Sequence, residues 1–365
     1  MPRRYIAIAL LSGLAACSDS PGPSGYSISL APEWVAVGIG DSAQLTATAL
    51  DPQGYTPLSP SITWSSSNPT VAQVSITGMV RGLSAGSATI RATYQDATDS
   101  TAALVAPPVL VGAGDIAACP STAHDSTAAL LDTIPGAVFT AGDNAYINGT
   151  IVEYLACYHP SWGRHKSRTR PSPGNHEYNT AGLGYYEYFG DMAGDSGLGY
   201  YSYDFAKWHI VSLNSNVSMA AGSAQEQWLR ADLAAHPATC ALAYWHHPRF
   251  SSGTTHGNEP QTQPLWQALY DLGADVVISG HEHQYERFAP QKPDSTPDAT
   301  NGIREFVVGT GGAALYPFGP VRANSEVRNS TTHGVIKLTL NPNGYAWRYI
   351  TAAGAIADSG SGGCH

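Results

Sequence analysis

Residues 137–146 have the sequence AVFTAGDNAY. The apolar part shows no alternation with polar residues, and it is followed by Gly142-Asp143 and, three residues later, by Tyr146. A run of this kind is typical of a strand that is covered on both faces. Residues 109–111 and 275–278 have the same character. Functional groups in open α/β sheets gather just beyond the carboxyl ends of the strands, so Asp143 lies at a candidate site.

Amphipathic helices are predicted between such strands, at residues 125–133, 223–236 and 261–272. Ser223 and Glu226 have the spacing of a capping box, and Gly273 is placed to end the third helix in a left-handed conformation. Hairpins are predicted where strands lie close in sequence, at residues 200–213 and 335–349. Strands mixed with helices predict an α/β (α+β) sandwich of two mixed β-sheets flanked by helices.

The preceding part of the chain has an all-β pattern instead. Short alternating stretches are separated by turn residues, which predicts a β-sandwich over residues 26–105. Residues 106–108, Ala-Pro-Pro, are a stiff boundary, so the second domain is expected to span residues 106–365. The alternating stretches are residues 26–30, 44–50, 62–64 and 88–94.

Residues 40–45, 62–69, 71–72 and 82–90 resemble the bacterial Ig-like group 2 family. The resemblance implies an Ig-like sandwich that serves as a spacer or an adhesion unit. The segment has no titratable cluster, so no chemistry is expected from it.

The first 17 residues have the features of a targeting segment. Arg3 and Arg4 precede an apolar stretch at residues 6–14, which is too short to span a bilayer. Leu14-Ala15-Ala16-Cys17 is similar to a bacterial lipobox, which implies a lipoprotein signal peptide (residues 1–17) and a lipidated Cys17. An ordinary signal peptide cut near Ala16 is the alternative. Residues 18–25 would be a tether, so the chain is expected to be extracytoplasmic or secreted, in the periplasm or at the cell surface.

Cys17 apart, the sequence has Cys119, Cys157, Cys240 and Cys364. An even count in an exported chain is compatible with two disulfides, for which three pairings exist, and free buried thiols are the alternative. Cys119–Cys157 with Cys240–Cys364 is favoured, because Cys119 and Cys157 follow the ends of neighbouring predicted strands. The net charge is −10, and it becomes 16 − 28 = −12 when the two arginines of the signal peptide are removed. A nucleic-acid surface is therefore not expected, and a membrane would be reached only through the lipid anchor at Cys17.

Five short segments carry the candidate chemistry, and all but one follow an apolar run. The exception follows residues 170–173, Arg-Pro-Ser-Pro. The oxygen and nitrogen donors of these segments suit borderline divalent metals or Fe(III). The glycine before most of the candidate ligands is expected to permit a sharp turn and to leave room for a phosphate. The segments are Gly114-Asp115, Gly142-Asp143-Asn144-Ala145-Tyr146, Gly174-Asn175-His176-Glu177, His246-His247-Pro248 and Gly280-His281-Glu282-His283.

Together the five segments resemble the calcineurin-like metallophosphoesterase superfamily, over roughly residues 108–350. More narrowly they are similar to its purple acid phosphatase branch. Ala117 stands where many superfamily members have a histidine, and Tyr146 stands where the branch has a tyrosinate ligand. Residues 281–287 match the branch's last motif, and Gly309-Thr310-Gly311-Gly312 resembles its glycine-rich loop.

The resemblance implies a binuclear metal centre and an acid-phosphatase-type hydrolysis of phosphate monoesters, in which a metal-bound hydroxide attacks phosphorus. The substrate would be a small-molecule phosphate ester. One metal, Fe(III), would be held by Asp115, Tyr146 and His283. A divalent metal (Zn, Fe or Mn) would be held by Asn175, His246 and His281, with Asp143 as the bridge.

Two further histidines are implied as catalytic residues. His176 would contact a phosphate oxygen, and His256, ten residues after His246, would protonate the leaving group. His247 is expected to be a packing residue or to lie outside the ligand set. A phosphodiesterase or nucleotidase on the same site remains an alternative, as does a surface adhesion protein with a decayed enzyme domain.

Overall fold

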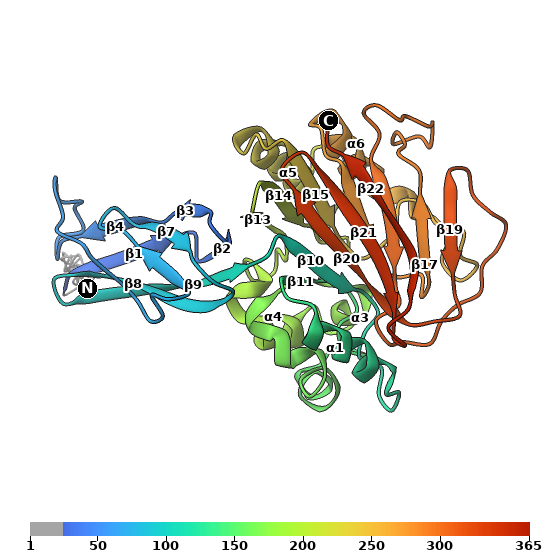
Figure 1. The fold of residues 1–365 in the computed structure, drawn as a ribbon, viewed down its shortest axis with the longest axis horizontal. Coiled ribbons are helices and arrows are strands. Elements are labelled where there is room, and N and C mark those ends of the chain that lie inside the picture. The colour runs from blue at the N-terminus through green and yellow to red at the C-terminus, as the bar shows by residue number, and fades with distance from the viewer. Residues whose placement is uncertain (1–24) are drawn as a thin grey trace, which may run out of the picture.

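A computed structural model describes residues 25–365 (Figure 1). The predicted signal peptide with Cys17, and the predicted tether up to residue 24, lie outside the described residues. No helix in the described part of the chain is long and apolar enough to cross a bilayer. An elongated all-β body at the left of Figure 1 joins a larger body of sheets and helices through strand β9 (Ala97–Ala106) and the residues that follow it.

The all-β body surrounds a small apolar core that includes Val37, Leu45 and Ile90. Residues 44–50, predicted as one strand, are two strands in different sheets, and the buried Leu45 separates them. Besides β9, the strands are β1 (Ser27–Ala31), β2 (Trp34–Gly38), β3 (Ser42–Gln44), β4 (Thr46–Leu50), β5 (Thr63–Ser66), β6 (Ala72–Val74), β7 (Met79–Gly82) and β8 (Gly86–Tyr94).

Two mixed sheets form the larger body, with the main apolar core between them. The first has the order β12-β11-β10-β20-β21-β22 and the second the order β13-β14-β15-β16-β18-β17-β19. The first comprises β10 (Val109–Ala113), β11 (Ala137–Ala141), β12 (Thr169–Ser172), β20 (Gly334–Asn341), β21 (Gly344–Thr351) and β22 (Ile356–Gly363). The second comprises β13 (Tyr201–Phe205), β14 (Trp208–Ser212), β15 (Cys240–Tyr244), β16 (Val276–Ser279), β17 (Tyr285–Phe288), β18 (Arg304–Val308) and β19 (Ser325–Asn329).

Helices cover the outer faces of the two sheets, as Figure 1 shows. Helices α5 (Ala224–Ala235) and α6 (Gln263–Asp271) pack their apolar faces on the second sheet, where Leu229, Leu265 and Leu269 join a core with Val211 and Ala243. The helices beside the first sheet are α1 (Ala123–Thr133), α2 (Ile151–Glu153), η1 (Tyr154–Tyr158), η2 (Trp162–Arg168), α3 (Asn175–Tyr178), α4 (Leu183–Phe189) and η3 (Gly190–Ala193). A short turn of helix, η4 (Pro260–Thr262), precedes α6.

The residues predicted to cap the helices do so in part. Ser223 Oγ accepts a hydrogen bond from Glu226 N–H, as its cap position predicts, but the Glu226 carboxylate turns to Gly222 N–H. Helix α6 starts two residues later than predicted, after η4, and Gly273 beyond it has the expected left-handed φ of 76°. The predicted sandwich of two mixed sheets flanked by helices, preceded by an all-β sandwich, is confirmed.

Parallel strands decide where the candidate ligands gather. Strands β10, β11 and β12 run parallel in one sheet, and β14, β15 and β16 run parallel in the other. Strand β12 is absent from the sequence-based prediction, because Pro171 argues against a strand. Its position at the edge of the sheet explains the proline, since an edge strand can lack one amide donor.

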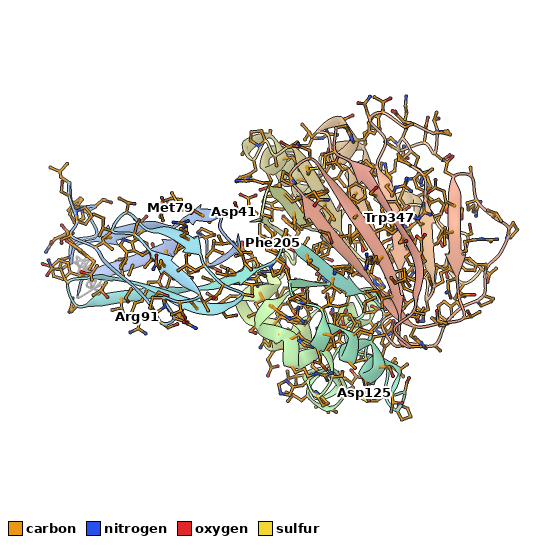
Figure 2. The ribbon with its side chains drawn as sticks, viewed as in Figure 1. Asp41, Met79, Arg91, Asp125, Phe205 and Trp347 are labelled. Atoms are coloured by element: carbon orange, nitrogen blue, oxygen red, sulfur yellow. A yellow bond between two sulfur atoms is a disulfide. The ribbon has the colours of Figure 1, made fainter. Side chains whose placement is uncertain are left out.

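The all-β body packs against the larger body through an aromatic contact. The Trp34 ring of β2 lies 3.3 Å from the Arg170 guanidinium of β12 and 5.5 Å from the Tyr203 ring of β13. Ala36 and Leu104 of the all-β body belong to the same apolar cluster as Phe205, which Figure 2 labels at this junction. The two bodies therefore share buried surface.

Both predicted disulfides are present. Cys119 pairs with Cys157, and Cys240 pairs with Cys364, with Cα–Cα distances of 6.0 and 5.3 Å. The second bond ties the C-terminus to the first residue of β15.

Candidate metal centre

Seven side chains from both sheets converge at the carboxyl ends of the parallel strands. Each lies in the loop or helix that follows such a strand: β10, β11 and β12 in the first sheet, β15 and β16 in the second. Five are buried, and Asn175 and His281 are partly exposed. They are the predicted ligands Asp115, Asp143, Tyr146, Asn175, His246, His281 and His283.

The first donor set consists of Asp115, Tyr146 and His283. The Tyr146 hydroxyl donates to Asp115 Oδ1 at 2.8 Å and lies 3.1 Å from His283 Nε2. His283 Nε2 is 3.2 Å from Asp115 Oδ1. Three donor atoms about one hydrogen-bond length apart leave room for one shared cation among them.

The second donor set consists of Asn175, His246 and His281. His246 Nε2 lies 3.0 Å from Asn175 Oδ1 and 3.1 Å from His281 Nδ1. Asp143 Oδ2 is 3.2 Å from His246 Nε2, and the same carboxylate raises the pKa of Tyr146 in the first set. Asp143 therefore acts on both sets, and ligand atoms of Asp115, Asp143 and His246 lie within 4.8 Å of one another.

The imidazole rings are oriented for metal binding. His246 Nδ1 lies 2.8 Å from Ala141 O, and His283 Nδ1 lies 2.7 Å from Ala314 O. A carbonyl oxygen only accepts, so these nitrogens carry protons and a neutral ring turns the lone pair of Nε2 toward the centre. This arrangement is the usual one for metal-binding histidines.

The electrostatics of the centre also fit a cation. Burial disfavours the charged form of His246, but the Asp143 carboxylate outweighs burial and raises the pKa of His246 to about 9. Burial and the carboxylates of Asp115 and Asp143 raise the pKa of Tyr146 well above its usual value. The carboxylates thus attract positive charge, and Tyr146 would ionise only beside a cation.

Three of the seven residues hold a left-handed backbone that non-glycine residues rarely adopt. Asp115, Asp143 and His281 have φ values of 60°, 50° and 68°. Such backbone costs roughly 1–3 kcal/mol per residue and persists where the surroundings fix it. Here the carboxylates help to fix it, since Asp115 Oδ2 accepts from His281 N–H and Asp143 Oδ1 accepts from His176 N–H.

The glycines before the ligands have another role than the predicted sharp turn. Only Gly142 has a positive φ, of 77°. A Cβ at Gly174 would lie 2.0 Å from Asp143 Oδ1, and one at Gly280 would lie 2.6 Å from Asp115 Oδ2. These glycines are required because the carboxylates pack directly against them.

Glu177, for which no role was predicted, joins two loops that carry predicted ligands. Its Oε1 accepts from the N–H groups of Asn144 and Ala145, and its Oε2 accepts from Gly174 N–H. The side chain is fully buried, and burial, followed by the Asp143 charge, raises its pKa to about 7. Its position two residues after Asn175, within the motif, was the only signal in the sequence.

The two predicted catalytic histidines border the centre. His176 Nδ1 lies 2.6 Å from Ile147 O, and its Nε2 lies 3.7 Å from Asp143 Oδ2. The His256 ring stacks on His281 with 3.9 Å between the centroids. His247 points its Nδ1 to Ser215 Oγ at 2.7 Å, outside both donor sets, as expected.

Tyr316 is a neighbour of the centre that the sequence did not indicate. Its half-buried ring stacks on His283 at 3.9 Å, with 10° between the planes, and lies 5.9 Å from the His256 ring. Its N–H donates to His283 O. The nearby glycine-rich loop, residues 309–312, was the only sequence signal for this region.

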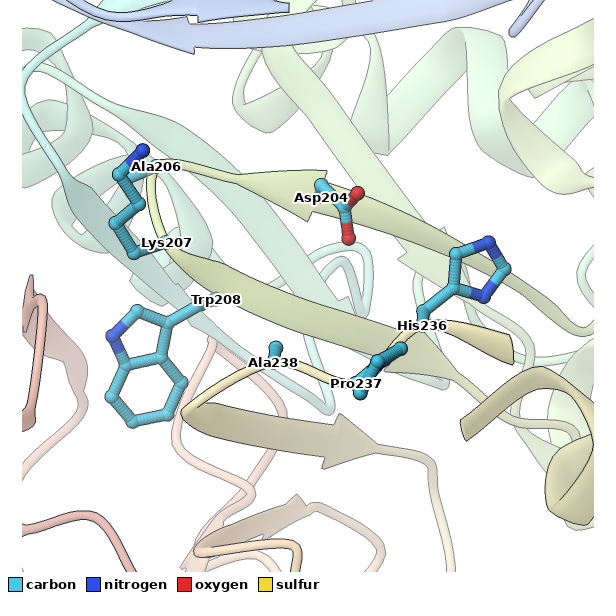
Figure 3. A pocket seen from close by; sticks show the side chains of 7 residues that line it. All are labelled: Asp204, Ala206, Lys207, Trp208, His236, Pro237 and Ala238. Carbon is cyan, nitrogen blue, oxygen red and sulfur yellow. The ribbon is translucent and has the colours of Figure 1, made fainter. Parts of the chain in front are cut away.

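A second histidine and carboxylate cluster has a structural explanation. His209 Nδ1 and Nε2 lie 2.8 Å from the carboxylates of Asp204 and Asp232, so both ring nitrogens are paired. Burial opposes protonation, but the two carboxylates raise the pKa of His209 to about 9. Figure 3 shows the adjacent cavity of about 220 Å³, which Asp204, Lys207 and His236 help to line. We assign this cluster to an ion-pair network that joins β13, β14 and α5.

Comparison with known proteins supports the two-domain organisation. Residues 26–105 match the family described as bacterial Ig-like domain (group 2), and residues 111–285 match the family described as calcineurin-like phosphoesterase. Purple acid phosphatase 15 of Arabidopsis thaliana is 28% identical over 200 residues, which are 45% of this chain and 38% of the plant protein. Purple acid phosphatase 22 of the same plant is 33% identical over 149 residues, 38% of this chain and 34% of that protein.

A solved structure has the same fold. Purple acid phosphatase PPD1 from yellow lupin (Lupinus luteus) seeds matches 87% of this chain and 67% of its own, with a TM-score of 0.61 and 17% identity. In the two Arabidopsis proteins, by contrast, the match covers well under half of each protein's length.

Proposed function

We propose that this chain, whose residues 111–285 form a calcineurin-like phosphoesterase domain behind an Ig-like domain, hydrolyses phosphate monoesters at a binuclear metal centre. The observation that carries the proposal is the pair of donor sets. Asp115, Tyr146 and His283 converge within 3.2 Å, and a second set converges around His246 Nε2 within 3.1 Å. Asp143 contacts the second set and acts electrostatically on the first.

The chemistry of the donors favours two different metals. The first set, which contains a phenol oxygen, suits Fe(III), and the second set suits a divalent metal such as Zn, Fe or Mn. Bound there, the metal pair would polarise the phosphoryl group and supply a nucleophilic water at neutral pH. Asp143 would be shared between the two metals.

The residues around the donor sets would handle the phosphate and the leaving group. His176 Nδ1 donates to Ile147 O, and in the imidazolium form its Nε2–H would also donate to a phosphate oxygen. His256, over the second set, would donate a proton to the leaving oxygen, a role that contributes about 10²–10⁴-fold in other enzymes.

Hydrolysis of p-nitrophenyl phosphate by the purified protein tests the proposal. The Asp143→Asn variant should lose at least about 10²-fold of kcat, because the shared ligand loses its charge. Full activity in Asp143→Asn would sink the two-metal proposal. Bis(p-nitrophenyl) phosphate is the parallel substrate, and faster turnover of this diester would favour the phosphodiesterase alternative.

Metal analysis with a visible spectrum tests the identity of the metals. One Fe per chain, with a broad band that disappears in Tyr146→Phe, is expected if Tyr146 binds Fe(III) as tyrosinate. A colourless, iron-free and active protein would remove Tyr146 from the ligand set. The complete donor sets argue against a decayed enzyme domain, since decay removes ligands.

We also propose that the mature chain is extracytoplasmic and lipid-anchored to a bacterial membrane through Cys17. The lipobox at residues 14–17 supports this location, and two disulfides are typical of an oxidising compartment. Expression with a labelled fatty acid should label the chain but not the Cys17→Ala variant. Equal labelling of both would contradict the anchor.

A further inference from the structure

The loop that carries His256 is held by buried carboxylates. We call residues 249–257 the His256 loop; it follows His246-His247-Pro248 and leads His256 back over the centre. Glu305 accepts hydrogen bonds from the N–H groups of Arg249 and Phe250, each at 3.0 Å. Glu286 accepts from Ser252 N–H at 2.7 Å.

Glu282 binds the end of the loop where His256 lies. Its Oε1 accepts from His256 N–H at 2.6 Å and from Gly257 N–H at 2.5 Å. All three glutamate side chains are fully buried. They come from the segment between His281 and His283, from β17 and from β18, so the His256 loop is held by the second sheet and by the loop of two predicted ligands.

The middle of the His256 loop also packs against the Glu282 carboxylate. A Cβ at Gly253 would lie 2.1 Å from the carboxyl carbon of Glu282. The second oxygen, Oε2, is buried and has no hydrogen-bond partner among the described residues. The carboxylate is thus enclosed by the His256 loop.

Burying a carboxylate to hold a loop costs free energy, because the charged group loses its hydration. An apolar residue of similar size would avoid the cost of desolvating the charge, so stability alone does not account for Glu282. Two charge-assisted hydrogen bonds to consecutive amides do fix the backbone on which the His256 ring is carried. Among the described residues, the His256 ring contacts the His281 ring at 3.9 Å and the Tyr316 ring at 5.9 Å, measured between centroids.

We propose that Glu282 is a positioning residue, which holds His256 over the second donor set so that its ring reaches the leaving oxygen of the substrate. The inference rests on the proposed function, in which His256 is the proton donor. Glu286 and Glu305 fix the first half of the loop, whereas Glu282 fixes the residue that reacts.

Leaving-group dependence tests the assignment. An alkyl phosphate such as glycerol phosphate requires protonation of its leaving oxygen, whereas p-nitrophenolate leaves without it. Glu282→Leu should therefore lose about 10-fold or more of kcat on the alkyl ester and less than about 3-fold on p-nitrophenyl phosphate. Glu282→Gln keeps an acceptor oxygen for both amides and should retain most of the alkyl activity.

A double variant separates positioning from general loss of structure. In the His256→Ala background, Glu282→Leu should have no further effect on the alkyl ester, because residues that act as a unit are not additive. Gly253→Ala, which presses on the carboxylate from the loop, should reproduce the selective loss if Glu282→Leu does not fold. Metal content and melting temperature are measured for every variant.

The outcomes distinguish the two proposals. If His256→Ala affects both esters equally, the proposed role of His256 fails. If His256→Ala is selective for the alkyl ester but Glu282→Leu and Gly253→Ala are not, the positioning role of Glu282 is wrong. An equal loss on both esters in Glu282→Leu, together with a loss of metal, would likewise overturn it.

Discussion

Single residues at the centre are packed so closely that one added methyl group should disable it. Gly174→Ala would place a Cβ 2.0 Å from Asp143 Oδ1, which also accepts from His176 N–H. The shared carboxylate would have to move, so we expect bound metal to fall below one equivalent per chain and kcat to fall at least about 10²-fold. Metal analysis and p-nitrophenyl phosphate turnover measure both effects.

Gly363→Ala is the matched control for this substitution. The atom nearest to a Cβ at Gly363 is 4.0 Å away, and the site lies in β22, far along the chain from the ligand loops. Metal content and turnover of this variant should equal those of the unmodified chain. Normal activity in Gly174→Ala would show that the Asp143 loop tolerates displacement.

The residue types at the centre were predictable, whereas their backbone was not. Asp143, His281 and the other predicted ligands stand in motifs whose donor chemistry can be interpreted without a structure. The left-handed φ of Asp143 and His281 cannot be, because it results from hydrogen bonds to groups far away in the chain. The roles of Glu177 and Glu282 were not predictable for the same reason. Apart from Gly174 N–H, the amides that Glu177 binds lie about 30 residues away in the chain, and the amides that Glu282 binds lie about 25 residues away.

Among the elements, the ion-pair network at His209 should make the association of β13, β14 and α5 depend on pH. The pKa of His209 is raised to about 9 against an ordinary value of 6.5. A raised pKa means that the stabilisation is fully present below about pH 6.5 and is lost as the pH rises through 9. Asp204 is exposed, so we expect roughly 1–3 kcal/mol in all.

Denaturant unfolding at pH 6 and pH 9.5 measures this contribution. The free energy of unfolding of His209→Gln should lie below that of the unmodified chain at pH 6, and the gap should shrink at pH 9.5. The control is His159→Gln, since the His159 ring pairs with the neutral Tyr188 hydroxyl. A gap that stays constant with pH would mean that His209 is not the titrating group.

Elements with strong periodicity matched their prediction, and the edge strand did not. Helix α5 and the hairpin of β20 and β21 have clear local signals, so their positions follow from the sequence. Strand β12 contains Pro171 and has no alternation, and it is a strand only because β11 offers it a parallel partner. That pairing places Asn175 at the centre.

On the scale of the whole molecule, we expect the Ig-like domain to stabilise the phosphoesterase domain, beyond the spacer role that its family implies. Arg170 is nearly fully buried in β12, and its Nη2 has no hydrogen-bond partner among the described residues. The Trp34 ring, 3.3 Å away, provides a cation–π contact that compensates the buried charge. Trp34→Ala should therefore cost about 1–3 kcal/mol of unfolding free energy.

Calorimetry of Trp34→Ala tests this contact, with Arg91→Ala as the control. Figure 2 labels Arg91 on the surface of the Ig-like domain, away from the junction. The control should melt like the unmodified chain, and a chain without residues 25–105 should melt below both while its folded fraction keeps most of its turnover. An unchanged melting temperature in Trp34→Ala would leave the Ig-like domain as a spacer.

The sequence by itself determined the two domains, the sandwich class and the residue types of the centre, whereas it only favoured one of three disulfide pairings. These depend on local periodicity and on donor chemistry, both of which are properties of residue types. Only the tertiary structure decided the left-handed backbone of Asp143 and His281, how the His256 loop is held, and that Trp34 covers Arg170. Such contacts join residues that are far apart in the chain, and close packing of the two sheets and the Ig-like domain brings them together.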